Sequence, residues 1–372
     1  MFKLQWVRHT GGLKDPLILE DYMKLNLGSI KPVYRNVDFN KPNIFNENGS
    51  DLFEDQLLIG GNPTGIANMN TVRHQWGVSI YNTMLGNFWI PQSVDMTDDK
   101  RTKNTLTEDE LRATYDTLGF LIFMDSFQVN NLPNIADVFT SPIVKMCFAG
   151  QEFDETIHTM SYQYIAETLL PTSERDAIYD RWKDVPALKD RIQTISAVAQ
   201  AYIDNPNWDT FYDVVVHNLI LEGLYFYQGF NYFDQLSHRN KLTQCAKQID
   251  YIRRQEFVHR GLFINIIKDI GVDKEFIVDR MKRAVTNEIK WCHYVYGDRI
   301  MGISKKSSEQ YVKYLANGLL TALGIEAVYK DVKNPYPHLE MAAKQGGSKE
   351  NFFETTVTSY DQAGSLSGWD DI

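Results

Sequence analysis

The chain has 372 residues, of which 43% are hydrophobic, and a formal net charge of −10 at pH 7. This length and composition suffice for one large hydrophobic core, while the acidic balance and the lack of a basic stripe argue against nucleic acid as a partner. The three cysteines form no CxxC pair, which disfavours a disulfide framework or a thiolate metal site. No apolar run approaches the roughly 18 residues of a membrane span and no signal sequence opens the chain, so we expect a cytoplasmic protein without a membrane segment.

The first part of the sequence, residues 1–67, is irregular and rich in asparagine, proline and glycine. We expect it to form an arm that wraps over the core. A helix is predicted over residues 69–86. It should end before the Phe-Trp-Ile-Pro segment of residues 88–91, because proline restricts the residue before it to an extended conformation.

A Thr-Glu-Asp-Glu capping box at residues 107–110 predicts the start of a longer helix, which should reach about residue 129 and be broken by residues 130–134. Pro142 is expected in the first turn of the next helix, where proline is tolerated. No strand pattern of useful length is present, so the predicted fold class is all-α. Further helices are predicted over residues 173–184, 187–204, 273–296 and 307–323, and on either side of residues 237–240.

Residues 68–345 are thus expected to form one helical domain. Residues 346–372, by contrast, are rich in glycine, serine, threonine and aspartate. Such a segment cannot bury enough apolar surface to offset the entropy lost on ordering. We therefore predict a flexible C-terminal tail that becomes ordered when a partner holds it.

Two Glu-x-x-His pairs, Glu155 with His158 and Glu256 with His259, occur in separate helical segments. Because successive residues of a helix are turned by about 100°, the members of each pair share one helix face. Tyr162 lies one turn beyond His158 on the same face. A carboxylate, an imidazole and a phenol are therefore predicted to lie together on the first of these helices.

Two further acids, Asp125 and Glu222, lie within apolar helical runs, where a carboxylate is costly unless it is protonated, paired or bound to metal. One acid from each of two helices, together with Glu-x-x-His from each of two others, is the ligand set of carboxylate-bridged di-metal helical bundles. Such ligands suit two metal ions per subunit, most readily iron, with manganese or a mixed pair left open. The predicted metal ligands are Asp125, Glu155, His158, Glu222, Glu256 and His259.

Apolar residues at helical spacing accompany these ligands. Phe226 and Phe230 follow Glu222 by four and eight residues, and Ile252 precedes Glu256 by four. We expect them to form an apolar cage around Tyr162 that would prolong the life of a tyrosyl radical. They also fit as ordinary core residues, and the two roles are compatible.

These segments resemble the radical-generating small (beta) subunit of class I ribonucleotide reductase, from about residue 88 to the C-terminus. The Asp-Ser-Phe-Gln of residues 125–128 resembles the first ligand segment of that family, and residues 155–162 resemble the second with Tyr162 in register as the radical tyrosine. Trp89 resembles the tryptophan that begins the radical-transfer path. Tyr360 resembles the tyrosine that passes the radical to the catalytic subunit.

The resemblance implies a ferritin-like helical homodimer whose oxidised di-metal site stores one oxidising equivalent. That equivalent would pass through Trp89 and Tyr360 to a cysteine of the large (alpha) subunit, which reduces ribonucleotides to deoxyribonucleotides. The C-terminal tail would bind the alpha subunit, with Trp369 and Ile372 as anchors. The absence of a nucleotide-binding motif in the sequence agrees with substrate binding elsewhere.

Gln255 departs from the family pattern, because many members have an aspartate there that hydrogen-bonds the ligand histidine and the transfer tryptophan. A neutral amide keeps the geometry but not the charge, so either transfer through Trp89 is tuned differently or the metals hold the oxidant. Two alternative functions fit the sequence less well. A di-metal oxidase or hydroxylase acting on a small molecule does not explain Tyr360 in the tail or the aligned Trp89. A metal-storage or structural protein does not explain acids embedded in the apolar runs of four separate helices.

The remaining polar candidates are given less specific roles. Glu152 and Asp154 flank Glu155 and either support the ligands or, at least as readily, are solvated. Histidines without a partner at ligand spacing are expected at the surface or as hydrogen-bonded polar residues; these are His217, His238, His293 and His338. The cysteines are expected to be buried apolar residues; these are Cys147, Cys245 and Cys292.

Overall fold

The computed structural model describes residues 23–337 of the chain. Within this part the polypeptide is helical, and no strand forms beyond one isolated bridge between Ile59 and Phe139. The all-α prediction is therefore confirmed. No helix within residues 23–337 is both long enough and apolar enough to cross a membrane.

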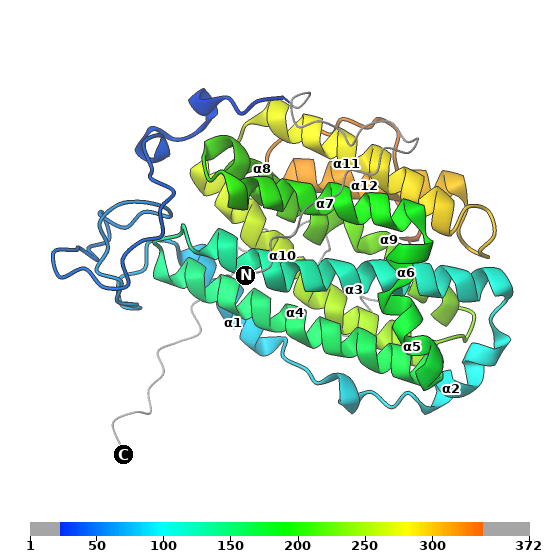
Figure 1. Cartoon of the computed structure of the whole chain (residues 1–372). Coiled ribbons are helices and arrows are strands. Elements are labelled where there is room, and N and C mark those ends of the chain that lie inside the picture. The colour runs from blue at the N-terminus through cyan, green and yellow to red at the C-terminus, as the bar shows by residue number, and fades with distance from the viewer. Residues whose placement is uncertain (1–22, 338–372) are drawn as a thin grey trace, which may run out of the picture.

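Long helices form the centre of the molecule, and two of them, α3 (Glu108–Ala136) and α4 (Pro142–Leu169), lie side by side (Figure 1). α10 (Thr243–Ile270) packs against α4 and against both α8 (Trp208–Ile220) and α9 (Tyr227–Ser237). The apolar core fills the space between these helices. The other helices are α1 (Gln75–Gly86), α2 (Thr97–Thr102), α5 (Thr172–Tyr179), α6 (Arg181–Asp184), α7 (Pro186–Asp204), α11 (Lys274–Val295) and α12 (Lys305–Ala322), with short 3-10 turns at Leu27–Ser29, Pro32–Tyr34, Pro91–Ser93 and Lys103–Thr105.

Local capping signals fix the starts of the central helices. The Thr107 hydroxyl accepts a hydrogen bond from the backbone N–H of Glu110 (3.2 Å), and the Glu110 carboxylate accepts one from the Thr107 N–H (2.9 Å). Pro142 occupies the first turn of α4, and the Asn207 side chain caps α8. The starts predicted from the capping box at residues 107–110 and from Pro142 are confirmed, because such signals depend on residues within one turn.

Two helix ends differ from the prediction. α1 begins at Gln75 rather than at residue 69, because Arg73 is held in a loop by Gln56 of the arm, whose Oε1 accepts the Arg73 N–H (3.0 Å). α3 continues through Pro133 to Ala136 instead of ending near residue 129. The added turns bury Leu132 and Ile135 completely, so tertiary burial outweighs the local breaking signal.

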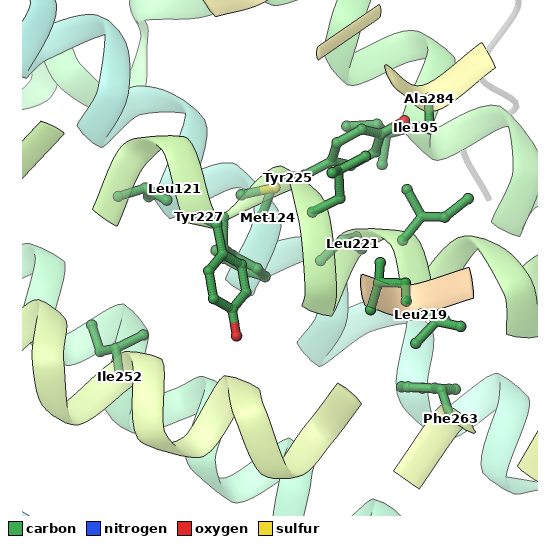
Figure 2. Close-up of a cluster of buried hydrophobic side chains, with 14 of the residues drawn as sticks. Leu121, Met124, Ile195, Leu219, Leu221, Tyr225, Tyr227, Ile252, Phe263 and Ala284 are labelled. Atoms are coloured by element: carbon green, nitrogen blue, oxygen red, sulfur yellow. The ribbon is translucent and has the colours of Figure 1, made fainter. Parts of the chain in front are cut away.

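A π-helical turn, Leu221–Tyr225, joins α8 to α9 and was not predicted. It carries Glu222, and turns of this kind are frequent at functional sites. Side chains leave the turn and the start of α9 in different directions: in Figure 2, Tyr227 points toward the helix that carries Ile252, whereas Tyr225 lies beside Ile195 and Ala284. Tyr225 and Tyr227 therefore extend to opposite sides of the turn within one hydrophobic core (Figure 2).

The described part of the N-terminal arm lies at one end of the bundle (Figure 1). It is attached by hydrogen bonds from the Lys31 N–H to the Ile270 carbonyl (2.9 Å) and from the Asn26 N–H to Asp273 Oδ2 (2.7 Å). Ile30 is fully buried at this attachment. Other apolar side chains of the arm are exposed, among them Ile44, Phe45, Leu52 and Phe53.

Candidate metal centre

The side chains of the predicted ligands converge in the core, and all of them are 0% exposed. They form two overlapping groups whose ligand atoms lie within 4.8 Å of one another. The first group is Asp125, Glu155, His158 and Glu256, and the second is Glu155, Glu222, Glu256 and His259. α3, α4, the π-helical turn and α10 supply them. Glu155 and Glu256 belong to both groups, which is the position that a bridging carboxylate requires.

In the first group, called the His158 subsite below, the imidazole Nδ1 faces the acids. It lies 3.5 Å from Asp125 Oδ1, 3.2 Å from Glu155 Oε2 and 3.1 Å from Glu256 Oε1. Burial alone would lower the pKa of His158, but these acceptors raise it well above its ordinary value. A positive charge is therefore favoured beside this nitrogen.

The second group, called the His259 subsite below, has the same arrangement. His259 Nδ1 lies 3.4 Å from Glu155 Oε1, 3.2 Å from Glu256 Oε2 and 3.7 Å from Glu222 Oε2. Burial opposes protonation, yet the surrounding carboxylates raise the pKa of His259 well above its ordinary value. The two imidazole rings are 5.9 Å apart between centroids, so the subsites are adjacent.

Apart from the two imidazoles, the carboxylates have no basic partner among the described residues. Both oxygens of Asp125, Oε2 of Glu222 and Oε1 of Glu256 make no hydrogen bond. Among the described residues, none of the four carboxylates pairs with lysine or arginine. Burial raises the pKa of Asp125 and of Glu222 well above the usual range, as expected for acids without a cation. Two divalent cations would supply the missing charge, so these residues fit a di-metal site.

Two glutamines hydrogen-bond a predicted ligand, a role that was not predicted from the sequence. Gln151 Nε2 donates to Glu222 Oε1 (2.9 Å), and Gln128 Nε2 donates to the same oxygen. Gln128 follows Asp125 by three residues and Gln151 precedes Glu155 by four. Each therefore shares a helix face with a predicted ligand, and that spacing is the signal that was available.

Trp89 and Gln255 are brought together beside His158. The Trp89 indole Nε1–H donates to Gln255 Oε1 (2.8 Å), and His158 Nε2 lies 3.0 Å from the same oxygen. Gln255 is fully buried, and Trp89 is nearly so. The Trp89 ring also stacks on Tyr251, with centroids 4.9 Å apart.

Asp154 is buried behind the second histidine, so the interpretation that it is solvated is wrong. Its Oδ1 accepts a hydrogen bond from Gln255 Nε2 (2.6 Å), and its Oδ2 lies 3.2 Å from His259 Nε2. The helix turn that points Glu155 into the core also directs Asp154 toward α10 rather than toward solvent. Glu152 is only half-buried.

Tyr162 is also fully buried, and its hydroxyl makes no hydrogen bond. Burial, followed by the negative charge of Asp125, raises the pKa of Tyr162 well above its ordinary value. Phe226, Phe230 and Ile252 are likewise 0% exposed, and the two phenylalanine rings stack with centroids 5.7 Å apart. The phenol is therefore protonated at neutral pH in an interior rich in apolar side chains.

The other candidates are distributed as follows. The prediction for His217 is wrong, since this residue is buried with no hydrogen bond to its Nε2. His238 is exposed and His293 is half-buried with Nε2 3.3 Å from the Lys305 carbonyl oxygen, as expected. All three cysteines are buried free thiols, which confirms their predicted role. The residues predicted in the tail and His338 lie outside the described part of the chain; the tail residues are Tyr360, Trp369 and Ile372.

A family model described as "Ribonucleotide reductase, small chain" matches residues 66–335. The chain belongs to this family. It is the beta subunit of a ribonucleoside-diphosphate reductase and contains a buried di-metal carboxylate site in its helical core. As a beta subunit of this family, it has an alpha subunit as its partner.

Individual relatives agree with the family assignment. The ribonucleoside-diphosphate reductase subunit beta of Halalkalibacterium halodurans is 32% identical over 325 residues, which cover 85% of this chain and 94% of that protein. The solved R2 subunit of ribonucleotide reductase from Clostridium botulinum superposes with a TM-score of 0.79 at 34% identity, over 82% of this chain and 99% of that chain. The dimanganese(II)-NrdF of Streptococcus sanguinis superposes with a TM-score of 0.65 at 22% identity, over 75% of this chain and 98% of that chain, a likeness of fold alone.

Proposed function

We propose that the two overlapping groups of ligands bind two metal ions, and that the oxidised site supplies the radical equivalent with which the alpha subunit reduces ribonucleotides. The observation that carries this proposal is the cluster of buried carboxylates with no lysine or arginine partner among the described residues. When bound, the metal pair would supply the oxidising power. The protein's own contribution would be to fix the ligands and to keep water out.

Tyr162 is proposed as the residue that stores the radical. Its complete burial keeps reductants and water from the ring, and its raised pKa keeps the phenol protonated before oxidation. Phe226, Phe230 and Ile252 are proposed to form the apolar surroundings that prolong the life of the radical.

Trp89 is proposed as the first residue of the transfer path, since its indole N–H meets the Gln255 oxygen that also contacts His158. Gln255 would hold Trp89 and the ligand histidine in fixed relative positions. Tyr360 in the tail would complete the path to the alpha subunit.

We propose iron as the working metal, with manganese or a mixed pair as alternatives, because carboxylate oxygen and imidazole ligands suit both. The name of the Streptococcus sanguinis neighbour records a dimanganese(II) site in that protein. Reconstitution of the metal-free chain with iron(II) or manganese(II), followed by metal analysis, should give two equivalents per chain. Glu256→Ala should lose at least one, and two equivalents retained in this variant would contradict the ligand assignment.

The stored oxidant is tested by Tyr162→Phe, which removes only a hydroxyl. Metal content should remain at two equivalents, while the tyrosyl radical signal in electron paramagnetic resonance and the turnover with the alpha subunit should disappear. Full turnover in this variant would transfer the storage role to the metals.

We propose that the tail, residues 346–372, binds the alpha subunit through Trp369 and Ile372 while Tyr360 carries the radical. Deletion of residues 364–372 should weaken subunit association without changing metal content. Tyr360→Phe should retain association and stop turnover, because phenylalanine is much harder to oxidise than tyrosine. Normal turnover in Tyr360→Phe would contradict the transfer path, and unchanged affinity in the truncated chain would contradict the docking role.

We further propose a homodimeric, cytoplasmic protein with an arm at residues 1–67 and a helical domain at residues 68–345. The free cysteines favour a reducing compartment. An apolar surface at Phe88 and Phe153, whose exposed rings stack with centroids 6.1 Å apart, supports self-association. Phe153→Asp should therefore shift the sedimentation of the chain from dimer to monomer. A dimer of unchanged affinity would exclude this surface.

A further inference from the structure

One hydrogen-bonded chain connects both metal-binding histidines to Trp89. It runs from the Trp89 Nε1 and His158 Nε2 atoms to Gln255 Oε1, then from Gln255 Nε2 to Asp154 Oδ1, and from Asp154 Oδ2 to His259 Nε2. All of its members are buried. The hydrogen bonds run from His158 of α4 to Gln255 of α10, back to Asp154 of α4 and on to His259 of α10, so they connect the outer sides of the two subsites.

The direction of each hydrogen bond follows from chemistry. An indole N–H only donates and a carboxylate only accepts, so the Gln255 amide presents its oxygen to Trp89 and its nitrogen to Asp154. The same oxygen then accepts the Nε2–H of His158, and Asp154 accepts the Nε2–H of His259. Both histidines are thereby fixed with Nδ1 free to bind metal.

Among the residues linked by these hydrogen bonds, the carboxylate is Asp154, and it lies next to His259 rather than His158. His259 donates directly to the Asp154 carboxylate, whereas His158 donates to a neutral amide. A carboxylate behind a metal-bound imidazole makes the imidazole a stronger donor to the metal. The two subsites, which are otherwise built from similar ligands, therefore differ in the charge behind their histidines.

We propose that Asp154 is the charged positioning residue of the metal centre and makes the His259 subsite the one that binds a divalent metal first. Gln255 transmits only orientation to His158 and Trp89. Many family members have a carboxylate at the position of Gln255. In this protein the carboxylate is instead that of Asp154 on α4, one hydrogen bond further from His158 and Trp89. This inference rests on the ligand set proposed above.

The test is manganese(II) binding to the full-length, metal-free chain under anaerobic conditions, without turnover. Free manganese(II) is followed by electron paramagnetic resonance, and anomalous diffraction from crystals loaded with one equivalent identifies the occupied subsite. In the native chain, the first equivalent should occupy the His259 subsite. Asp154→Asn should weaken that subsite by about tenfold to a hundredfold and change the His158 subsite less.

The decisive variant is the double substitution Asp154→Asn with Gln255→Glu. It conserves shape and net charge but moves the carboxylate one hydrogen bond along the chain, next to His158 and Trp89. The order of filling should reverse, with the His158 subsite occupied first. Because charge is conserved, this variant tests the inference even where Asp154→Asn folds poorly.

The control is Glu152→Gln, which removes a charge from the same helix at a half-buried position that does not belong to the chain of hydrogen bonds. Its manganese affinities should remain within about twofold of those of the native chain. Two manganese ions bound without the predicted order, or an order that the double variant leaves unchanged, would overturn this inference alone. A native chain that binds no manganese, iron or other divalent metal would overturn the proposed ligand set as well.

Discussion

Two regions of the same interior hold buried charges in opposite ways. In the metal centre, carboxylates and imidazoles lack any lysine or arginine partner within residues 23–337. On the other side of the π-helical turn, Arg191 of α7 is paired with Glu288 of α11. The Arg191 guanidinium also lies 4.2 Å from the Phe120 ring centroid and 4.5 Å from that of Tyr225, the residue seen beside Ile195 and Ala284 in Figure 2.

This difference shows how a structural carboxylate can be distinguished from a metal ligand in a protein interior. Glu288 has its cation within the protein, so its burial is explained by structure alone. Asp125 and Glu222 have no lysine or arginine, and the basic groups nearest to them are His158 and His259 of the same cluster. A buried acid therefore points to a metal when its surroundings offer imidazoles but no lysine or arginine.

Among the substitutions, the largest expected effect on stability comes from breaking the Arg191 pair. Arg191→Met leaves Glu288 buried and unpaired, which should reduce the free energy of unfolding by about 3–5 kcal/mol. The double variant Arg191→Met with Glu288→Leu should recover most of that loss, because it removes both charges. Denaturant unfolding of the metal-free proteins measures both. Equal stability of the single variant and the native chain would contradict the conclusion that Arg191 balances the charge of Glu288.

Metal binding should stabilise the folded protein through the metal centre and independently of the Arg191–Glu288 pair. At a manganese(II) concentration about a hundredfold above the dissociation constant, each independent site adds about 2.7 kcal/mol to the free energy of unfolding. Arg191→Met should gain as much as the native chain, whereas Glu256→Ala should gain less. Unfolding with manganese(II) and again with chelator distinguishes the two. A native chain that gains nothing would mean that the carboxylates are not balanced by metal.

The buried histidines sharpen the comparison, because the pKa of His217 is shifted in the opposite direction from those of His158 and His259. Burial, with the charges of Arg280 and Arg191, lowers the pKa of His217 to about 4. Below the ordinary histidine pKa of about 6.5, the unfolded chain binds a proton at His217 that the folded chain does not bind. Lowering the pH from about 6.5 to about 4 therefore lowers the free energy of unfolding. Between pH 6.5 and 5 the loss is about 1.6 kcal/mol.

The contribution of His217 is isolated by subtraction. His217→Gln should lose about 1.6 kcal/mol less than the native chain over the same pH interval, since glutamine does not titrate. The difference between two unfolding series, one for each protein, gives the value. Parallel pH profiles would show that the pKa of this histidine is the same in the folded and unfolded chains.

The smallest effect is expected for an exposed ion pair. Lys41 and Asp137 lie 2.8 Å apart with side chains 67% and 48% exposed. Lys41→Ala should change the free energy of unfolding by at most about 0.5 kcal/mol, because water screens the pair. A loss near that of Arg191→Met would show that burial is not what distinguishes the two regions.

The sequence by itself predicted the fold class and the ligands of the candidate site. Both depend on spacing within single helices: Glu-x-x-His places two donors on one face, and the capping box at Thr107 fixes where α3 begins. Such signals extend over one or two turns and survive without knowledge of the rest of the fold. Asp125 and Glu222 were found because an acid inside an apolar run is costly wherever it packs.

Only the tertiary structure decided what lies behind those ligands. Asp154 follows from contacts between α4 and α10 that no local pattern encodes, and the sequence favoured a solvated position for it. The π-helical turn at Glu222, the late start of α1 and the extension of α3 through Pro133 also depend on distant packing. The physical reason is the same in each case: the free energy that selects these features comes from groups far apart in the sequence, and a helical pattern describes only neighbours within a turn or two.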